Sequence, residues 1–252
     1  HAVVMTNAED VQRATAIFNV WEPYVNTSDG GVFSLSQMWI TSADPILETV
    51  EAGWHVYPSL WRDNRVRFFV FYTLDRYKTL CYNFQCGGFV QEGRLSPGMP
   101  FQDVSKYDRQ QWETSISIAR EHRGNNMVWA VYIQNNLVGH WPASLFRNLN
   151  QPAKRVDFGG EVAFVQDSER TSHTRSHMGS GHFPGEGFKK GAYIRNIQLF
   201  DSHGTRISRF RERTHYATHP QCYDIKEYSS TDDHWGDYIF YGGPGADAHS
   251  CV

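Results

Sequence analysis

Two short segments each place a glutamate where acid–base chemistry could occur. If residues 50–57 form a strand, Glu51 lies on a polar face and the alternate residues form an apolar face. If residues 156–164 form a strand, Glu161 is separated from an apolar face in the same way. Glycines lie close to each acid, Gly53 near Glu51 and Gly159 and Gly160 near Glu161, and they leave room for another backbone to approach. Each segment therefore offers one carboxyl group on the side away from the hydrophobic layer.

Paired carboxyl groups support a definite chemistry. Two carboxyls that lie close together do not both ionise easily, so one keeps a proton while the other is charged. The charged member can remove a proton from water, and the protonated member can stabilise an oxyanion or protonate a leaving nitrogen. Such a pair works best at acid pH, where the singly protonated form dominates.

The pattern does not by itself select these two residues. The chain has 27 Asp and Glu residues, and polar side chains cover the solvent face of any sandwich. Asp75, Glu92 and Asp157 fit the spacing argument as well as Glu51 and Glu161 do. A further signal is needed to single out the pair.

The elements that must position these groups are expected to be strands. Apolar and polar residues alternate with a period of two in residues 32–40, 50–57, 65–74, 127–134, 156–165, 192–200 and 206–214. Short helices are expected only at residues 142–148, which begin with a proline, and at residues 8–14. Many short strands and few helices predict an all-β antiparallel sandwich or barrel, formed as one domain over residues 1–252.

Composition excludes several classes of partner. The formal net charge is −3 with neutral histidines, which argues against nucleic acid. No run of 18 apolar residues is present, so the sequence predicts no membrane-spanning helix. Protonation of the 12 histidines would make the net charge positive, which is compatible with an acidic working compartment.

Four cysteines and one sequon are typical of a secreted, extracellular chain. The cysteines allow three pairings, and local spacing favours Cys81 with Cys86 and Cys222 with Cys251. By the loop-entropy relation these bridges would contribute about 2 and about 3.5 kcal/mol. Asn26 begins the sequon and is the candidate glycosylation site.

Several motifs that occur in a fixed order carry a resemblance to a known family. The glutamates lie in two of them, Glu51-Ala52-Gly53-Trp54 and Gly159-Gly160-Glu161. The full set occupies residues 33–39, 51–58, 81–86, 138–146, 159–162, 178–184 and 241–245. Each motif is weak alone, but the ordered set is highly specific. Over residues 15–251 the chain resembles the catalytic domain of the neprosin family of plant glutamic peptidases.

The resemblance implies a fold, a reaction and a site. The implied fold is an antiparallel β-sandwich of two sheets with a substrate cleft on a concave face, and the implied catalytic pair is Glu51 and Glu161. The implied disulfides are the two that local spacing favours, and no cofactor is implied. Family members carry a signal and an inhibitory propeptide, and characterised members cut after proline at acid pH. As a working interpretation Glu51 activates the water and Glu161 acts as the acid, with the reverse assignment open.

Other residues are candidates for contacts with a peptide substrate. Gln37 and Trp39 share one strand face, and Tyr57 shares a face with Glu51. We predict that these three line the cleft and that the aromatic rings suit a proline side chain, although core packing of Trp39 is an equal alternative. His182 is a further candidate for substrate contact.

A metal site is not predicted. His173 and His177 lie near His182 in the sequence, and His215 lies near His219. Imidazole is a common ligand, but no Asp or Cys completes a familiar ligand spacing.

Two rival functions fit a β-sandwich with cleft glutamates and many aromatic residues. One is a glycoside hydrolase, in which carboxyls about 5 Å or about 6.5–9.5 Å apart cleave a glycosidic bond. The other is a non-catalytic module that binds cell-wall glycans. Hydrolysis of casein or of a proline-containing peptide would separate a peptidase from both.

Overall fold

The computed structural model describes residues 1–42, 46–165, 173–207, 212–247 and 251, and strands dominate it. The strands form two sheets. The first contains β1 (Ala2–Val11), β3 (Gly31–Thr41), β4 (Thr49–Val56), β5 (Arg67–Leu74), β6 (Thr79–Tyr82), β11 (Ala153–Phe164) and β13 (Glu212–Ala217). The second contains β2 (Arg13–Asn19), β7 (Val90–Gln91), β8 (Glu113–Arg123), β9 (Asn126–Ile133), β10 (Asn136–Pro142), β12 (Ala192–Phe200), β14 (Asp224–Ser229) and β15 (Asp237–Gly242).

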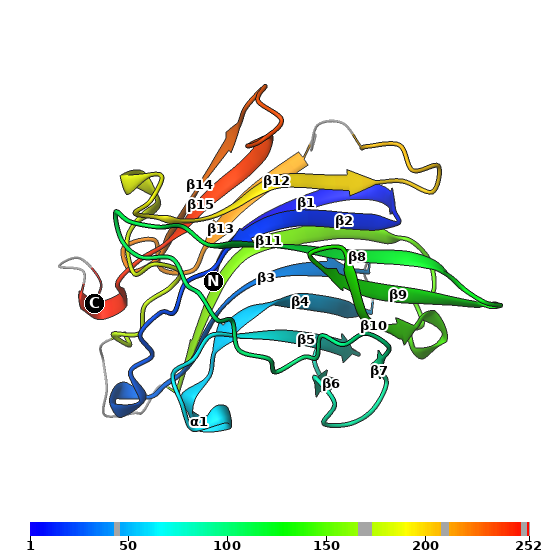
Figure 1. Ribbon diagram of the computed structural model, residues 1–252, viewed down its shortest axis with the longest axis horizontal. Helices are drawn as coiled ribbons and strands as arrows, with labels where there is room; N and C mark the ends of the chain where they lie inside the picture. The colour runs from blue at the N-terminus through cyan, green and yellow to red at the C-terminus, as the bar shows by residue number, and fades with distance from the viewer. Residues whose placement is uncertain (43–45, 166–172, 208–211, 248–250, 252) are drawn as a thin grey trace.

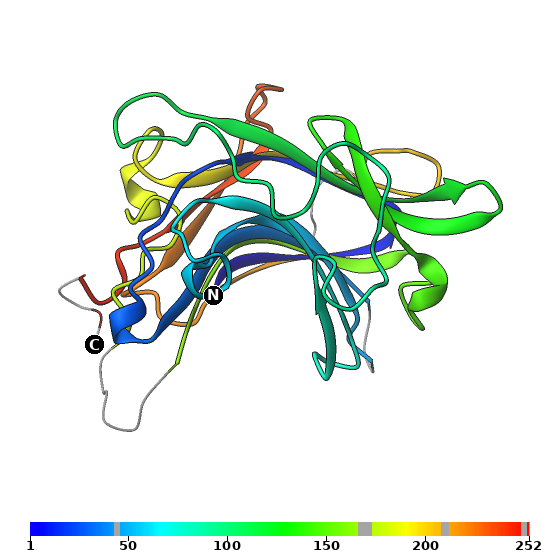
Figure 2. The same cartoon turned by 60° about the horizontal axis from the view of Figure 1, so that its bottom comes forward.

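The two sheets lie face to face as an antiparallel sandwich, which confirms the predicted fold class (Figure 1). The strand order is β13-β1-β11-β3-β4-β5-β6 in the seven-stranded sheet and β14-β15-β12-β2-β8-β9-β10-β7 in the eight-stranded sheet. In Figure 2 the seven-stranded sheet bends into an arch whose open side faces away from the other sheet. A concave outer face of this kind can hold an extended ligand.

The hydrophobic core fills the space between the sheets. In β4 the alternate residues Val50, Ala52, Trp54 and Val56 have no exposed surface and belong to this core. Val156 and Phe158 of β11 are equally buried. Strand alternation then places the other residues of each strand, including both candidate glutamates, on the outer face of the sheet.

The outer face of the seven-stranded sheet is itself partly apolar. Val3, Leu35, Trp39 and Phe69 form a second, smaller cluster of buried residues there. Strands β3 and β4 are therefore almost wholly buried, although only one of their faces meets the other sheet.

Helical structure in the described residues is confined to single turns. These are η1 (Thr27–Asp29), α1 (Pro58–Trp61), η2 (Ala143–Leu145), η3 (Pro184–Glu186) and η4 (Gly245–Asp247). None is long or apolar enough to cross a membrane.

Both helix predictions need correction. Residues 8–14 continue β1 and begin β2, because the backbone of β1 pairs with β11 and that of β2 pairs with β8 and β12. Asp10, with a φ of 60°, lies within β1, where the register with β11 shifts between Asn7 and Val11. Residues 142–148 contain only the turn η2, because Pro142 still pairs with Val128 as the last residue of β10.

The predicted strands are largely confirmed. Six of the seven alternating segments coincide with β3, β4, β5, β9, β11 and β12 to within a few residues. The seventh, residues 206–214, falls partly outside the described residues, and its end overlaps β13. The sequence pattern missed β1, β2, β6, β7, β8, β10, β14 and β15.

Candidate active site

A cavity of about 610 Å³ opens on the outer face of the seven-stranded sheet. Residues of β3, β4, β5, β6 and β11 form its floor and walls, and Leu60 of α1 closes one side. Both candidate glutamates line this cavity. The curvature of the sheet and the strand alternation together bring them to the same hollow.

Strand register sets the relation between the two glutamates. Glu51 of β4 lies opposite Trp39 of β3, and Glu161 of β11 lies opposite Leu35 on the other side of β3. The two carboxyls are therefore diagonal to each other, with Gln37 between them on the middle strand. All three side chains line the cavity.

Glu51 receives hydrogen bonds from three side chains. Thr49 Oγ1 donates to Oε1 at 2.5 Å, Tyr77 OH donates to Oε1 at 3.2 Å, and Gln37 Nε2 donates to Oε2 at 2.9 Å. The residue is only 3% exposed. These three hydrogen bonds fix the orientation of the carboxyl group. Among the described residues, no cationic side chain forms an ion pair with it.

Glu161 lies in a different environment. Its side chain is 23% exposed, and Nδ1 of His1 lies 3.7 Å from its Oε2. The carboxyl of Glu161 is thus more accessible to water than that of Glu51, and it has a basic group beside it.

Burial governs the protonation of both carboxyls. It raises the pKa of Glu51 to about 8, an increase that the negative charge of Glu161 enlarges and the three donors oppose. It raises the pKa of Glu161 to about 7. The pair therefore holds at least one proton well above the pH at which a solvated glutamate is ionised.

The predicted cleft residues Gln37, Trp39 and Tyr57 all line the cavity. Trp39 is 6% exposed and packs in the small outer cluster, not in the core between the sheets. Gln37 Oε1 is buried and has no hydrogen-bond partner among the described residues. The middle strand thus offers the site an unused acceptor next to Glu51.

His182 does not line the cavity. It lies in the loop before η3, where its Nδ1 is 2.9 Å from Glu186 Oε1 and the centroid of its ring is 4.2 Å from that of Tyr107. The contacts of His182 are those of a surface loop, which the prediction from its Gly-Ser-Gly-His segment did not anticipate.

Sequence reasoning missed an aromatic wall beside the glutamates. The ring of His55 stacks on Phe69 at 4.7 Å and on Tyr82 at 5.3 Å. Its Nε2 receives Trp61 Nε1–H at 3.0 Å and lies 2.6 Å from Tyr82 OH. Burial lowers the pKa of His55 to about 3, so this histidine is neutral and acts as a flat, largely apolar surface.

Thr49 and Tyr77 are the other residues that the sequence pattern missed. Thr49 lies two residues before Glu51, so strand alternation could have placed it on the same face. Tyr77 lies in the turn after β5, where no periodic signal applies.

The structure contains both disulfides favoured by local spacing. Cys81 of β6 pairs with Cys86, and Cys222 pairs with Cys251. The first closes a short loop next to the cavity wall. Asn26, the sequon residue, is partly buried, and its side chain accepts a hydrogen bond from the backbone N–H of Ser28.

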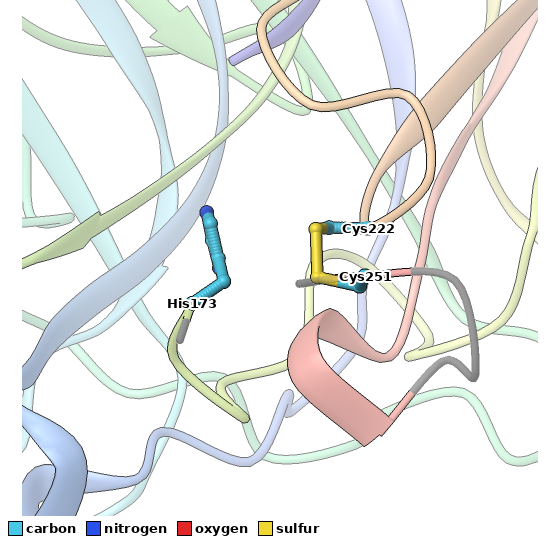
Figure 3. Close-up of side chains that lie close together, drawn as sticks. All are labelled: His173, Cys222 and Cys251. Atoms are coloured by element: carbon cyan, nitrogen blue, oxygen red, sulfur yellow. A yellow bond between two sulfur atoms is a disulfide. The ribbon is translucent and has the colours of Figure 1, made fainter. Parts of the chain in front are cut away.

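A second cluster of metal-ligand residue types lies away from the cavity. His173 approaches the disulfide of Cys222 and Cys251, and the ligand atoms of the three lie within 4.8 Å of one another (Figure 3). Because the two sulfur atoms are bonded to each other, they do not offer the pair of thiolates that a zinc site uses. The histidine instead packs against Phe164 and Tyr223.

Comparison with known proteins identifies the family. The chain is similar to scytalido-glutamic peptidase, solved as a crystal structure with a transition state analog inhibitor, at 9% identity and a TM-score of 0.49. That match covers 96% of this chain and 97% of the other. The family model described as Neprosin matches residues 30–244, which include the cavity and both glutamates. This protein therefore belongs to the neprosin family.

Proposed function

We propose that this protein hydrolyses peptide bonds with water activated by Glu51 and Glu161. The observation that carries the proposal is the shared cavity, in which burial raises the pKa of both carboxyls. A pair in this state supplies a proton acceptor and a proton donor from one residue type. The coupling between the two charges favours the singly protonated form that hydrolysis needs.

Exposure favours Glu161 as the base and Glu51 as the acid, which is the reverse of the working assignment from the sequence. Glu51 is 3% exposed, whereas the side chain of Glu161 is 23% exposed and lies beside His1. The more buried carboxyl keeps its proton more strongly. The three donors on Glu51 oppose this order, but burial is the larger effect on its pKa.

The reaction then balances over two steps. Glu161 takes a proton from water while the oxygen of that water attacks the carbonyl carbon, and Glu51 gives its proton to the carbonyl oxygen. In the second step Glu51 recovers its proton from the tetrahedral intermediate, the carbon–nitrogen bond breaks, and Glu161 protonates the leaving amine. The water and the peptide are consumed, and both glutamates return to their starting states.

We propose that the substrate is an extended peptide cut on the C-terminal side of proline. The support is the aromatic character of the cavity, where the rings of Trp39, Tyr57 and His55 present flat apolar surfaces. A proline ring is rigid and apolar, so it loses little conformational freedom when it packs against such surfaces.

The dependence of catalytic activity on pH should be bell-shaped. Activity falls on the acid side as Glu161 takes up a proton and on the alkaline side as Glu51 loses its own. Because burial raises the pKa of Glu161 to about 7 and that of Glu51 to about 8, we expect activity to be greatest near neutral pH, above the range of two solvated glutamates.

The decisive experiment compares Glu51→Gln with Glu161→Gln on a proline-containing peptide, with the cleavage sites read by mass spectrometry. A glutamine at position 51 still donates an N–H to the carbonyl oxygen, so we expect a loss of about 10²-fold in kcat. A glutamine at position 161 cannot accept a proton, so we expect a loss of about 10⁴-fold.

Asp157→Asn is the matched control. Asp157 is a buried acid on the same face of β11 as Glu161, but it lies outside the cavity and beside Arg155. We expect this variant to keep near wild-type kcat. If the wild type cleaves glycans and no peptide, or if neither Gln variant loses activity, the proposal is wrong.

Secretion is also proposed. Two disulfides join all four cysteines, and disulfides persist in oxidising compartments. Detection of the protein in the medium of expressing cells, with a mass increase removed by glycosidase and absent in Asn26→Gln, would support both secretion and glycosylation. Retention in the cytosol would contradict them.

A further inference from the structure

The turn between β5 and β6 has an unusual backbone. Asp75, Arg76 and Tyr77 have φ values of 54°, 57° and 64° and none is glycine. Each residue other than glycine in the left-handed region costs about 1–2 kcal/mol. Three in succession form a left-handed turn between the two strands.

This turn places Tyr77 over the cavity. The ring lies 6.5 Å from that of Phe71 at an interplanar angle of 27°, and the hydroxyl lies 3.2 Å from Glu51 Oε1. The residue is 45% exposed, so one part of the ring meets solvent at the mouth of the cavity while the hydroxyl reaches the carboxyl inside it.

The hydroxyl contact has a clear use during the reaction. When Glu51 gives its proton to the carbonyl oxygen, a buried negative charge develops on its carboxyl group. Oxygen Oε1 then carries hydrogen bonds from Thr49 and Tyr77, and a hydrogen bond to a charged acceptor is stronger than one to a neutral acceptor. These donors therefore stabilise the transition state more than the ground state.

We propose that Tyr77 is a positioning residue for Glu51, held by the left-handed turn so that its hydroxyl orients the acid and stabilises the charge formed on it. The inference rests on the proposed function of the glutamate pair. It adds a residue that lies on a different element from either glutamate. It also explains the left-handed β5–β6 turn as the feature that holds the Tyr77 hydroxyl at Glu51.

The test is Tyr77→Phe, which removes the hydroxyl and keeps the ring. We expect kcat to fall by about 10- to 100-fold with little change in KM, because the lost hydrogen bond is strengthened in the transition state. The groups that face Tyr77 are Glu51 and Thr49 of β4 and Glu161 of β11. Since Tyr77 lowers the pKa of Glu51, the alkaline limb of the pH profile should move to higher pH.

Tyr82→Phe is the matched control. Tyr82 lines the same cavity and its hydroxyl contacts His55, not either glutamate. A role of Tyr77 in packing alone would make the two variants alike, and neither would move the alkaline limb. We expect only Tyr77→Phe to move it, with melting temperatures of both variants close to the wild type.

The outcomes separate this inference from the function on which it rests. If the Gln variants at positions 51 and 161 abolish hydrolysis but Tyr77→Phe keeps the wild-type kcat and alkaline limb, the role of Tyr77 is wrong and the glutamate pair stands. If the Gln variants remain active, the proposed function itself has failed. A fall in kcat with an unmoved alkaline limb also overturns the role proposed for Tyr77.

Discussion

At the scale of single residues, two glutamates of the same chemistry differ through their surroundings. Glu51 is almost fully buried and receives three donors, while Glu161 is partly exposed beside His1. The chain thus divides two roles between identical side chains by burial and hydrogen bonding. The sequence alone could not assign these roles, because both residues have the same intrinsic pKa.

The raised pKa of Glu51 predicts a pH-dependent stability. The folded state favours the protonated carboxyl, so the stabilisation that Glu51 contributes is complete below its ordinary pKa of 4.5 and is lost as pH rises through the folded pKa of about 8. Glu51→Gln carries no such charge. Relative to the wild type, we expect the variant to gain about a few kcal/mol of unfolding free energy between pH 4 and pH 8.

Urea unfolding of both proteins across this pH range is the measurement. The difference between the two proteins isolates Glu51, because His55, whose pKa is shifted in the opposite direction, is present in both proteins and cancels. Burial lowers the pKa of His55 to about 3, so its contribution is lost as pH falls below its ordinary value. A difference in unfolding free energy that stays constant with pH would show that the pKa of Glu51 is not raised.

At the scale of elements, the close approach of β3 and β4 depends on a glycine. A Cβ at Gly53 would lie 2.0 Å from the backbone oxygen of Ser36 and 2.6 Å from Cβ of Gln37. Neither neighbour can move without shifting a central strand. The glycine therefore allows Glu51 and Gln37 to meet across the two strands.

Gly53→Ala tests this requirement. We expect a loss of about 2–4 kcal/mol in unfolding free energy, because overpacking at a central strand displaces backbone, and a fall in kcat as Glu51 and Gln37 separate. Gly185→Ala is the control, since a Cβ there would meet only the flexible end of Lys226 at 3.3 Å. Equal stability of the two variants in a denaturant titration would contradict the prediction.

At the scale of the whole molecule, one disulfide joins two distant parts of the chain, Cys222 before β14 and Cys251 after β15. Cys222 and Cys251 are separated by 29 residues, and the segment between them contains β14 and β15 at the edge of the eight-stranded sheet. The bridge restricts the unfolded chain more than the short bridge of Cys81 and Cys86, whose separation is 5 residues.

Replacement of both cysteines of each bridge by alanine should give unequal losses. Loop entropy predicts about 3.5 kcal/mol for the longer bridge and about 2 kcal/mol for the shorter. Guanidinium unfolding of the two double variants measures this difference. The reverse order would mean that native-state contacts, and not loop length, determine the contribution of each bridge.

The sequence determined the fold class and the faces on which the glutamates lie. Alternation in β4 and β11 follows from local chain geometry, so it fixed which side chains leave the core. Alternation also indicated Gln37, Trp39 and Tyr57 as residues of the cleft, and all three line the cavity. It could not distinguish Asp157 from Glu161, because both lie on the same face of one strand.

Only the tertiary structure decided how the site is completed. The curvature of the sheet brings residues of five strands around one cavity, and curvature is a property of many paired strands together. Tyr77 contacts Glu51 because of a left-handed turn that no periodicity in the sequence predicts. His182 contacts Glu186 and does not line the cavity. Local pattern fixes the direction in which a side chain leaves its strand, whereas its partners depend on how distant strands and turns are packed.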